Sequence, residues 1–456
     1  MTAAVQAGPT EAAPAAATRP GAGVLSAYGA GSLGMGVWIT VPGLLLLYFL
    51  TDVLAVPAAI AGLTLLLPKV VDVVVHPLLG SRSDRRARRV GHRRGMMRAG
   101  LLLGGALVGM FSVPEGLTGG PAALWVGGWF VVGNLLFAMF QVPYLTTPSD
   151  LQVGYHERTR VFMFRMLFLT LGLLGAGVSA PALVASGSRG DYTTMAAVLA
   201  VVMVVSAAVA LRGVRRLTEV SGFTVPGVEE HHTALGDVRV AWADRDFRAL
   251  VLSYMFTGMT THLFLAALPY YTAYVLGDPR YTALLMGLFL GPAAVTGPLW
   301  LWLSRRVGKQ RGLLLAQLTF VVGSLLLLTG GSVGVLGTAL VVAVLGTAFT
   351  GLQLLAFSMV PDAVAAAEAA GVSKAGAYTG VWTATEATST ALGPYLYSAA
   401  LALGGFVSSA GGQHVEQPGS AMTALLLGFT VLPALTMAVA VVFQRRYRLD
   451  DHAVRS

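Results

Sequence analysis

The sequence predicts an all-α membrane protein whose helices cross the bilayer about twelve times. Of its 456 residues, 55% are hydrophobic and only 11% are charged, whereas a soluble domain carries about 25% charged residues. Apolar stretches of roughly 20 residues, long enough to span a membrane as helices, recur along nearly the whole chain. We therefore expect a polytopic membrane protein, and not a globular domain held by one anchor.

The apolar stretches fall into two sets of six. The expected spans are 24–50, 57–80, 97–114, 121–145, 160–186, 192–212, 248–276, 281–304, 312–329, 333–358, 377–405 and 421–443. One long charged insertion separates the two sets. The expected organisation is a disordered cytoplasmic tail over 1–23, a six-helix bundle over 24–214, a cytoplasmic linker over 215–247, a second bundle over 248–444 and a tail over 445–456.

Basic residues are concentrated in the connections on one side of the predicted membrane. Lys and Arg beside a span resist translocation, so these connections are expected in the cytoplasm. The pattern predicts that both termini are cytoplasmic. The membrane is expected to be the inner (plasma) membrane of the cell. It also accounts for the net charge of +9 without nucleic acid, because the basic residues lie in short loops between spans.

The absence of cysteine excludes disulfides, thiolate metal sites and cysteine nucleophiles. The sequence contains no metal-ligand spacing, no phosphate-cradling loop after a strand, and no nucleophile–base pattern. We therefore expect neither a metal nor a cofactor, and no enzyme activity. The expected partners are a small-molecule solute and the lipid bilayer.

A short repeat relates the two halves. The run RVGHRRG, Arg89 to Gly95, recurs as RVGKQRG, Arg306 to Gly312, and each copy starts the third span of its half. A repeat at matching positions of two six-span sets indicates a duplicated architecture, with the solute route on the axis between the halves.

Asp72 is the most unusual residue of the predicted spans. It precedes Gly80, at the end of the span, by eight residues. At 1.5 Å of rise per residue it lies about 12 Å inside the membrane, whose hydrocarbon core is about 30 Å thick. A carboxylate there costs about 2.5 to 3.5 kcal/mol, so a functional role facing the protein interior is expected. His76 is four residues on and shares that face. The alternatives are that Asp72 pairs with Lys69, and that His76 caps backbone groups freed by Pro77.

The arginine-rich run after this span resembles a known loop. Gly80, Asp84 and Arg85, followed by Arg88 and Arg89, are similar to the loop between helices two and three of the major facilitator superfamily. Further residues narrow the resemblance to the glycoside-pentoside-hexuronide:cation symporters, the melibiose permease family. They are Asp72, Pro77, Ser83, Gly91, Arg93 and Arg94, with YGAGSLGMG from Tyr28, LLYFLTDVL from Leu46, VPYLTTPSDLQVGYHERTR from Val142, LPYYTAYVLGD from Leu268 and GAYTGVWTATEATSTALG from Gly376.

The resemblance implies a twelve-helix major facilitator fold, with two six-helix halves around a central cavity. It also implies alternating access, driven by a sodium ion, lithium ion or proton that enters with a sugar, and operation as a monomer. Asp72 matches the first acid of helix two, and Arg165 matches the arginine of helix five. The family's other key positions differ here: His76 replaces the second acid of helix two, Gln141 the acid of helix four and Gly36 the acid of helix one, and Glu386 lies near the lysine of helix eleven.

These differences favour a proton as the coupling ion. Sodium prefers several hard oxygen ligands, which a histidine and a single carboxylate do not supply. A carboxylate beside an imidazole suits a proton, since His titrates near neutrality. The expected proton site is therefore Asp72 with His76.

Polar and aromatic residues of other spans are expected to read the solute. These candidates are Arg165, Gln141, Glu386, Tyr144, His262 and Trp382. Gln141, Tyr144, His262 and Trp382 could instead make an interhelical hydrogen bond or a packing contact. Arg165 could instead be the counter-charge of Asp72 or a snorkelled structural arginine. Gly80, Asp84, Arg85 and Arg88 are expected to gate the cytoplasmic side, the alternative being a solvated loop that only sets topology.

The sequence therefore predicts a secondary transporter that moves a sugar or glycoside by proton symport. Two rival hypotheses stay open. The first is an exporter of an amphipathic metabolite or drug, motivated by the apolar helix-one face at Met35 and Gly36. The second is a membrane sensor or scaffold without transport activity, motivated by the missing acids.

Overall fold

The described part of the chain is helical. A computed structural model of the protein describes residues 19–225, 239, 242–369, 375–412 and 415–449. The first half comprises α1 (Ala22–Tyr48) with its π-helical end η1 (Phe49–Val53), α2 (Ala58–Val90), α3 (Arg94–Met97), α4 (Gly100–Phe111), α5 (Gly119–Thr146) with η2 (Thr147–Asp150), α6 (Tyr155–Leu183) and α7 (Arg189–Ser221).

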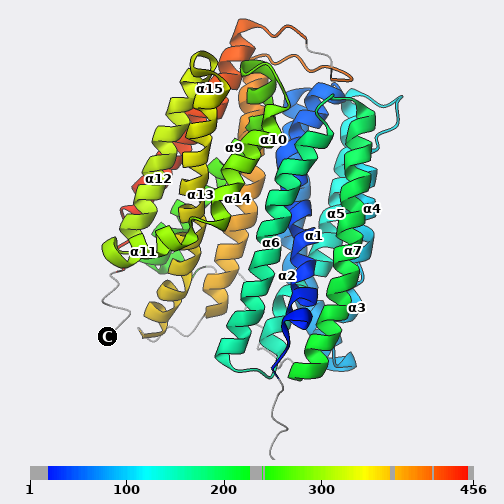
Figure 1. Ribbon diagram of the computed structural model, residues 1–456, viewed down its shortest axis with the longest axis vertical. Helices are drawn as coiled ribbons and strands as arrows, with labels where there is room; N and C mark the ends of the chain where they lie inside the picture. Colours follow the sequence, from blue (N-terminus) through cyan, green and yellow to red (C-terminus); the bar gives the residue numbers. More distant parts are fainter. Residues whose placement is uncertain (1–18, 226–238, 240–241, 370–374, 413–414, 450–456) are drawn as a thin grey trace, which may run out of the picture.

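The second half repeats this pattern (Figure 1). It comprises α9 (Arg245–Tyr270) with η3 (Tyr271–Val275), α10 (Tyr281–Leu290), η4 (Gly291–Ala294), α11 (Gly297–Val307), α12 (Lys309–Leu326), η5 (Leu327–Thr329), α13 (Gly330–Ala369), α14 (Ala375–Leu403) and α15 (Gly419–Gln444).

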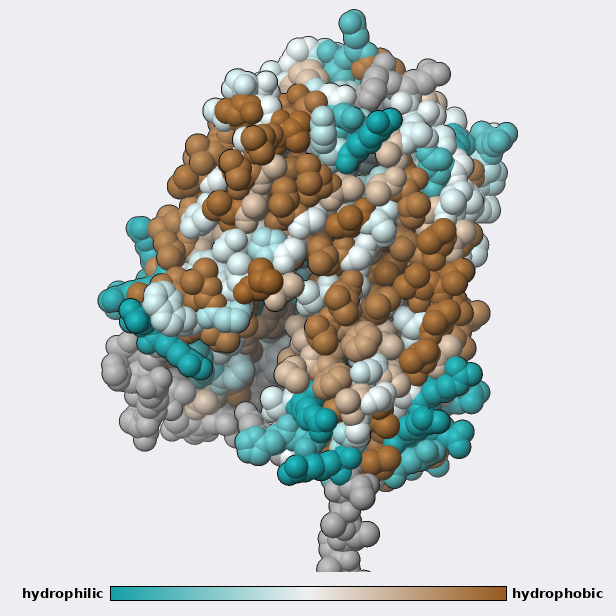
Figure 2. Space-filling model, viewed as in Figure 1, coloured by the Kyte–Doolittle hydropathy of each residue, from teal (hydrophilic) through white to brown (hydrophobic). Residues whose placement is uncertain are grey.

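These elements form the expected all-α fold of two six-helix halves. Seven apolar segments of the described chain are long enough to cross a membrane, and the pair α10 and α11, bent by 55°, makes an eighth. One of the seven, Lys309–Ala367, contains both α12 and α13. The set is completed by α2, α4 and α14. Figure 2 shows apolar residues over the middle of one face and hydrophilic residues gathered near its lower end.

The helices differ from the expected spans in three places. α2 continues beyond Gly80 to Val90, so the arginine run expected as a loop is largely the last turns of this helix. It ends at Gly91, whose φ of 72° suits a glycine C-cap. Likewise, α7 continues to Ser221, so the linker expected from residue 215 begins in a helix. The span expected over 281–304 is broken between α10 and α11.

α1 lies at the centre of the first half, in close contact with α6 and α7. A Cβ added to Gly36 would lie 2.7 Å from the backbone of Gly172 and Leu173, and one added to Gly213 would lie 2.4 Å from the backbone of Ala27. Small residues allow this approach, which is a common way to pack helices in lipid. The position expected to replace the family's helix-one acid therefore packs against α6, where a larger side chain has no room.

The two halves are bonded together at one end of the molecule. The loop between α14 and α15 lies there, at the upper end in Figure 1. The Ala55 N–H donates to the Ser409 carbonyl at 2.9 Å, and the Ser409 N–H donates to the Thr51 carbonyl at 2.9 Å. The Ser398 hydroxyl donates to the Ala58 carbonyl between α14 and α2. α1 begins, and α15 ends, at the opposite end.

Close packing of α1 and α6 predicts that Gly36→Ala destabilises the protein. A methyl group forced into a packed interface costs about 1–3 kcal/mol, so the midpoint of thermal unfolding in detergent should fall by several degrees. Gly43→Ala on the same helix is the matched control, because a Cβ there meets nothing within 4 Å. Equal midpoints for the two variants would contradict the assigned α1–α6 contact.

Candidate functional site

Ionisable residues of the two halves approach each other between α2 and α9. Lys69 of α2 lies with its ammonium 5.7 Å from the centre of the Phe130 ring, and it interacts electrostatically with His262 of α9. His262 Nδ1 is 2.7 Å from the Gly258 carbonyl oxygen, and its Nε2 is 3.4 Å from the Thr390 hydroxyl of α14. His262, expected to line the cavity, therefore lies where α2, α9 and α14 meet.

The second pair joins α2 to α5 within the first half. His76 Nε2 lies 3.3 Å from Gln141 Oε1, and both side chains are half-buried. Gln141 is the residue that the resemblance aligns with the family's helix-four acid, and its amide is neutral. The backbone of residue 72 belongs to α2, but the Asp72 side chain lies outside the described residues, and its role stays a prediction.

An acid and two aromatic rings form a third group in the second half. The Trp382 ring of α14 stacks on Tyr254 of α9 at a centroid distance of 4.0 Å. Glu386, one helical turn after Trp382, is half-buried and interacts electrostatically with Tyr254. Its carboxylate makes no hydrogen bond or ion pair with another described side chain. The group offers a carboxylate beside an aromatic face, which can bind hydroxyl groups and the apolar face of a sugar ring.

Arg165 lies apart from these groups, on α6. Its guanidinium stacks over the Phe162 ring at 4.9 Å and contacts Met166. It also interacts electrostatically with Tyr28 and Tyr144. Its Nε atom is buried with no hydrogen-bond partner among the described residues, so this cation retains a free donor.

Tyr144 is a packing residue in this structure. It is fully buried, and its ring stacks on Tyr28 at 4.8 Å. Its hydroxyl lies 3.0 Å from the Ser32 hydroxyl and donates to the Tyr28 carbonyl at 2.8 Å. Of the two roles open for this residue in the sequence, the structure places it in the interhelical one, between α1 and α5.

The proposed cytoplasmic gate includes Arg93, which was not among the gating residues expected from the sequence. Arg93, just before α3, is 7% exposed and forms ion pairs with Asp84 of α2 and with Asp150 of η2. It also donates to the Ser83 hydroxyl at 3.1 Å. Arg85 is exposed, and a Cβ added to Gly80 meets nothing within 4 Å. Asp84 is therefore paired with Arg93, and the place of Arg93 in the repeat was the available signal.

The second half has a corresponding ion pair. Lys309, which lies one position before the equivalent of Arg93 in the second copy of the repeat, pairs with Asp362 of α13 at 2.5 Å. The residue aligned with Lys309 in the first copy is His92. Burial and, after it, the charge of Arg94 lower the pKa of His92 below its usual value. The imidazole is then neutral near pH 7, and Arg93 supplies the cation of the first half.

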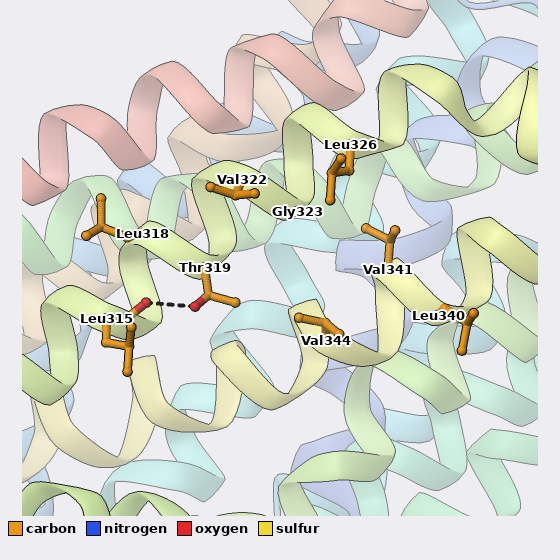
Figure 3. Close-up of a pocket in the computed structure, with 9 residues that line it drawn as sticks. All are labelled: Leu315, Leu318, Thr319, Val322, Gly323, Leu326, Leu340, Val341 and Val344. Carbon is orange, nitrogen blue, oxygen red and sulfur yellow. Dashed lines mark hydrogen bonds between the residues drawn. The ribbon is translucent and has the colours of Figure 1, made fainter.

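A surface groove lies away from these groups. It has a volume of about 480 Å³ and runs between α12 and α13 (Figure 3). Its lining is apolar except for Thr319, whose hydroxyl is bonded to the Leu315 carbonyl. Several lining residues, including Val322 and Leu340, are more than half exposed on the outside of the helices, where lipid is expected. Among the described residues, no three His, Asp or Glu side chains gather as a metal site.

Comparison with known proteins identifies the family. Residues 27–451 match the family model described as MFS/sugar transport protein. The chain belongs to this family. It is 24% identical to an uncharacterized symporter of Synechocystis, over 90% of each chain. It is 26% identical to a putative sulfoquinovose importer of Salmonella typhimurium, over 90% of this chain and 88% of the importer.

A solved structure supports the fold of this transporter. A bacterial homolog of the human lysosomal transporter Spinster, in an inward-facing and unoccupied conformation, superimposes with a TM-score of 0.65 at 14% identity. The match covers 95% of this chain and 96% of the homolog. Membership of the MFS/sugar transport family, together with the apolar spans, makes the protein a multi-pass membrane transporter and not an enzyme.

The burial of Arg93 predicts that Asp150→Asn strongly destabilises the transporter. Removing one partner of a buried ion pair costs about 2–5 kcal/mol, part of which the remaining Asp84 offsets. Unfolding in mixed detergent micelles measures the loss.

Glu219→Gln is the control for this variant, because Glu219 and Arg215 form an exposed pair one turn apart on α7. Such pairs contribute less than about 1 kcal/mol. If both variants unfold alike, the Arg93 contacts do not stabilise the protein.

Proposed function

We propose that this transporter takes up a small polar solute, a sugar or glycoside, together with a proton, by alternating access. Its family and the names of its relatives support the solute class. The proposed location is the inner (plasma) membrane with both termini in the cytoplasm, supported by the arginine-rich segments at the end where α1 begins.

The observation that carries the proposal is the meeting of ionisable groups from both halves. Lys69 of α2 and His262 of α9 interact across the boundary between the halves. Buried charges in a membrane protein are costly and mark solute or ion pathways. A boundary that is lined by such groups and, among the described residues, hydrogen-bonded at one end suits a transporter whose halves rock about a central site.

The proposed proton site is Asp72 with His76. A proton is favoured over sodium because the residues that the resemblance aligns with two of the family's acids are here a histidine and an amide, His76 and Gln141, which lie 3.3 Å apart. A sodium ion would need several hard oxygen ligands in this place. A proton needs only a base.

The proposed solute site is formed by Glu386, Trp382, His262 and Gln141. The Trp382 ring, stacked on Tyr254, offers a rigid aromatic surface, and the Glu386 carboxylate has no described partner to displace. Arg165 contributes a charge from α6. Asp84, held by Arg93, gates the cytoplasmic end.

The observation that motivated the rival function of export, an apolar face of helix one at Met35 and Gly36, does not favour export in this structure. Met35 and Gly36 are buried, and Gly36 faces the backbone of α6. They therefore present no apolar surface to a solute. The scaffold hypothesis does not explain why ionisable groups meet between the two halves.

Asp72→Asn is expected to abolish accumulation of solute against a gradient while leaving the protein in the membrane. The variant cannot release a proton, so substrate-dependent alkalinisation of a weakly buffered cell suspension should disappear. Glu416→Gln, a change to an exposed carboxylate in the α14–α15 loop, is the control and should behave as the parent protein does.

Three outcomes separate the functions. Alkalinisation that responds to a sugar and is lost in Asp72→Asn supports symport. Raised resistance to toxic compounds without alkalinisation supports export. A phenotype that survives Asp72→Asn with no transport of either kind supports a scaffold and refutes the role of Asp72.

A further inference from the structure

Asp52 is a buried acid that the proposed transport cycle does not yet use. The sequence places it in a connection between spans, but it lies in η1 and is 2% exposed. Its carboxylate accepts a hydrogen bond from the Thr51 hydroxyl at 2.6 Å and one from the Tyr274 hydroxyl at 2.5 Å. Tyr274 belongs to η3, so this carboxylate bonds the first half to the second.

The backbone beside Asp52 makes further bonds to the second half. Its carbonyl accepts from the Ser409 hydroxyl at 3.0 Å and from the Gly412 N–H at 3.0 Å. The Thr51 hydroxyl lies 2.6 Å from the Tyr270 hydroxyl of α9. The bonded end of the molecule cannot open without separating Asp52 from these partners and exposing it to water.

The titratable groups that face Asp52 are tyrosines. They come from five of the surrounding elements: Tyr48 of α1, Tyr192 of α7, Tyr270 of α9, Tyr274 of η3 and Tyr397 of α14. No Lys, Arg or His of the described chain faces the carboxylate. His414 of the adjacent loop lies outside the described residues and is therefore included in the test below.

This setting makes ionised Asp52 costly in the closed state. A buried carboxylate without a cation loses its hydration, and two hydroxyl donors replace only part of it. A protonated Asp52 keeps the same geometry, since its O–H can donate to Thr51 while its other oxygen still accepts from Tyr274. When the end opens, water stabilises the ionised form.

We propose that Asp52 is a proton-binding site at the outer gate, where protonation holds the two halves closed and ionisation releases them. The gate is the end formed by η1, η3 and the α14–α15 loop, and its outer placement rests on the proposed orientation. In a symporter, a proton arriving from outside would close this gate behind the bound solute. The gate itself requires neither solute nor the Asp72 site.

The absence of cysteine allows a direct test. Ser398→Cys places a thiol at a fully buried position of α14 beside the gate, and Glu416→Cys places one in the exposed part of the α14–α15 loop. Intact cells are treated with a membrane-impermeant maleimide from about pH 5.5 to about pH 8, without solute. The labelling rate at position 398 is divided by the rate at position 416, which cancels the pH dependence of the thiol chemistry.

We expect the ratio to rise several-fold with external pH in the Asp52 protein. Asp52→Asn, which mimics the protonated acid, should keep the ratio low at every pH. Tyr274→Phe removes a donor to the ionised carboxylate and should raise the ratio, with its midpoint moved to lower pH. His414→Gln should leave the profile unchanged.

Four outcomes would overturn the proposal. A labelling ratio that does not change with pH in the protein that retains Asp52 would show that opening of the gate does not depend on a proton. A raised ratio in Asp52→Asn assigns the residue a merely structural role, and loss of the profile in His414→Gln assigns the proton to the histidine. Absence of external labelling at Glu416→Cys contradicts the outer placement. Because the assay measures access and not transport, its failure leaves the proton symport at Asp72 separately testable.

Discussion

Bonding of the two halves at one end is the constraint on which the rest of the structure depends. Main-chain and side-chain hydrogen bonds join Thr51, Asp52 and Ala55 to the loop around Ser409. In lipid, a backbone polar group without a partner costs several kcal/mol. Opening this end therefore requires other partners for these groups, and water can supply them only if the end faces an aqueous side.

The opposite end is organised by ion pairs inside each half. Arg93 joins α2 to η2, and Lys309 joins the start of α12 to α13. Because each pair lies within one half, it stiffens that half without tying it to the other. A rigid half can then move as a body when the bonded end separates, which is how small changes at one site are transmitted through packed helices.

The family pattern is modified here in ways that have different physical consequences. His76 and Gln141 lie together, so the change of two acids to an imidazole and an amide replaces one polar contact with another. Gly36 instead belongs to the α1–α6 packing contact, where an acid has no space. Glu386 adds a carboxylate beside an aromatic pair. The proposed central site thus differs from the family pattern in chemistry and also in shape.

Several features followed from the sequence because they depend on local chemistry. These features are the twelve apolar stretches, the repeat at Arg89 and Arg306, and the charge asymmetry. Placing polar groups in lipid is unfavourable, and this constraint acts on each segment separately. Together, these features were enough to predict the fold class, whereas the family was indicated by the motif residues around Asp84 and Arg85. The helical end of α2 was missed because arginine is a good helix former and the helix continues until Gly91 stops it.

Other features depended on which residues distant in the chain meet. Asp52 reads as a connection residue, and only the tertiary structure brings Tyr274 to its carboxylate, 222 positions away. Tyr144 reads as a polar lining residue, yet the approach of α1 encloses it. The place of a residue within an apolar stretch indicates how deep it lies in the membrane, but not which face of the helix it occupies. The packing of the twelve helices decides which face meets another helix, the cavity or lipid.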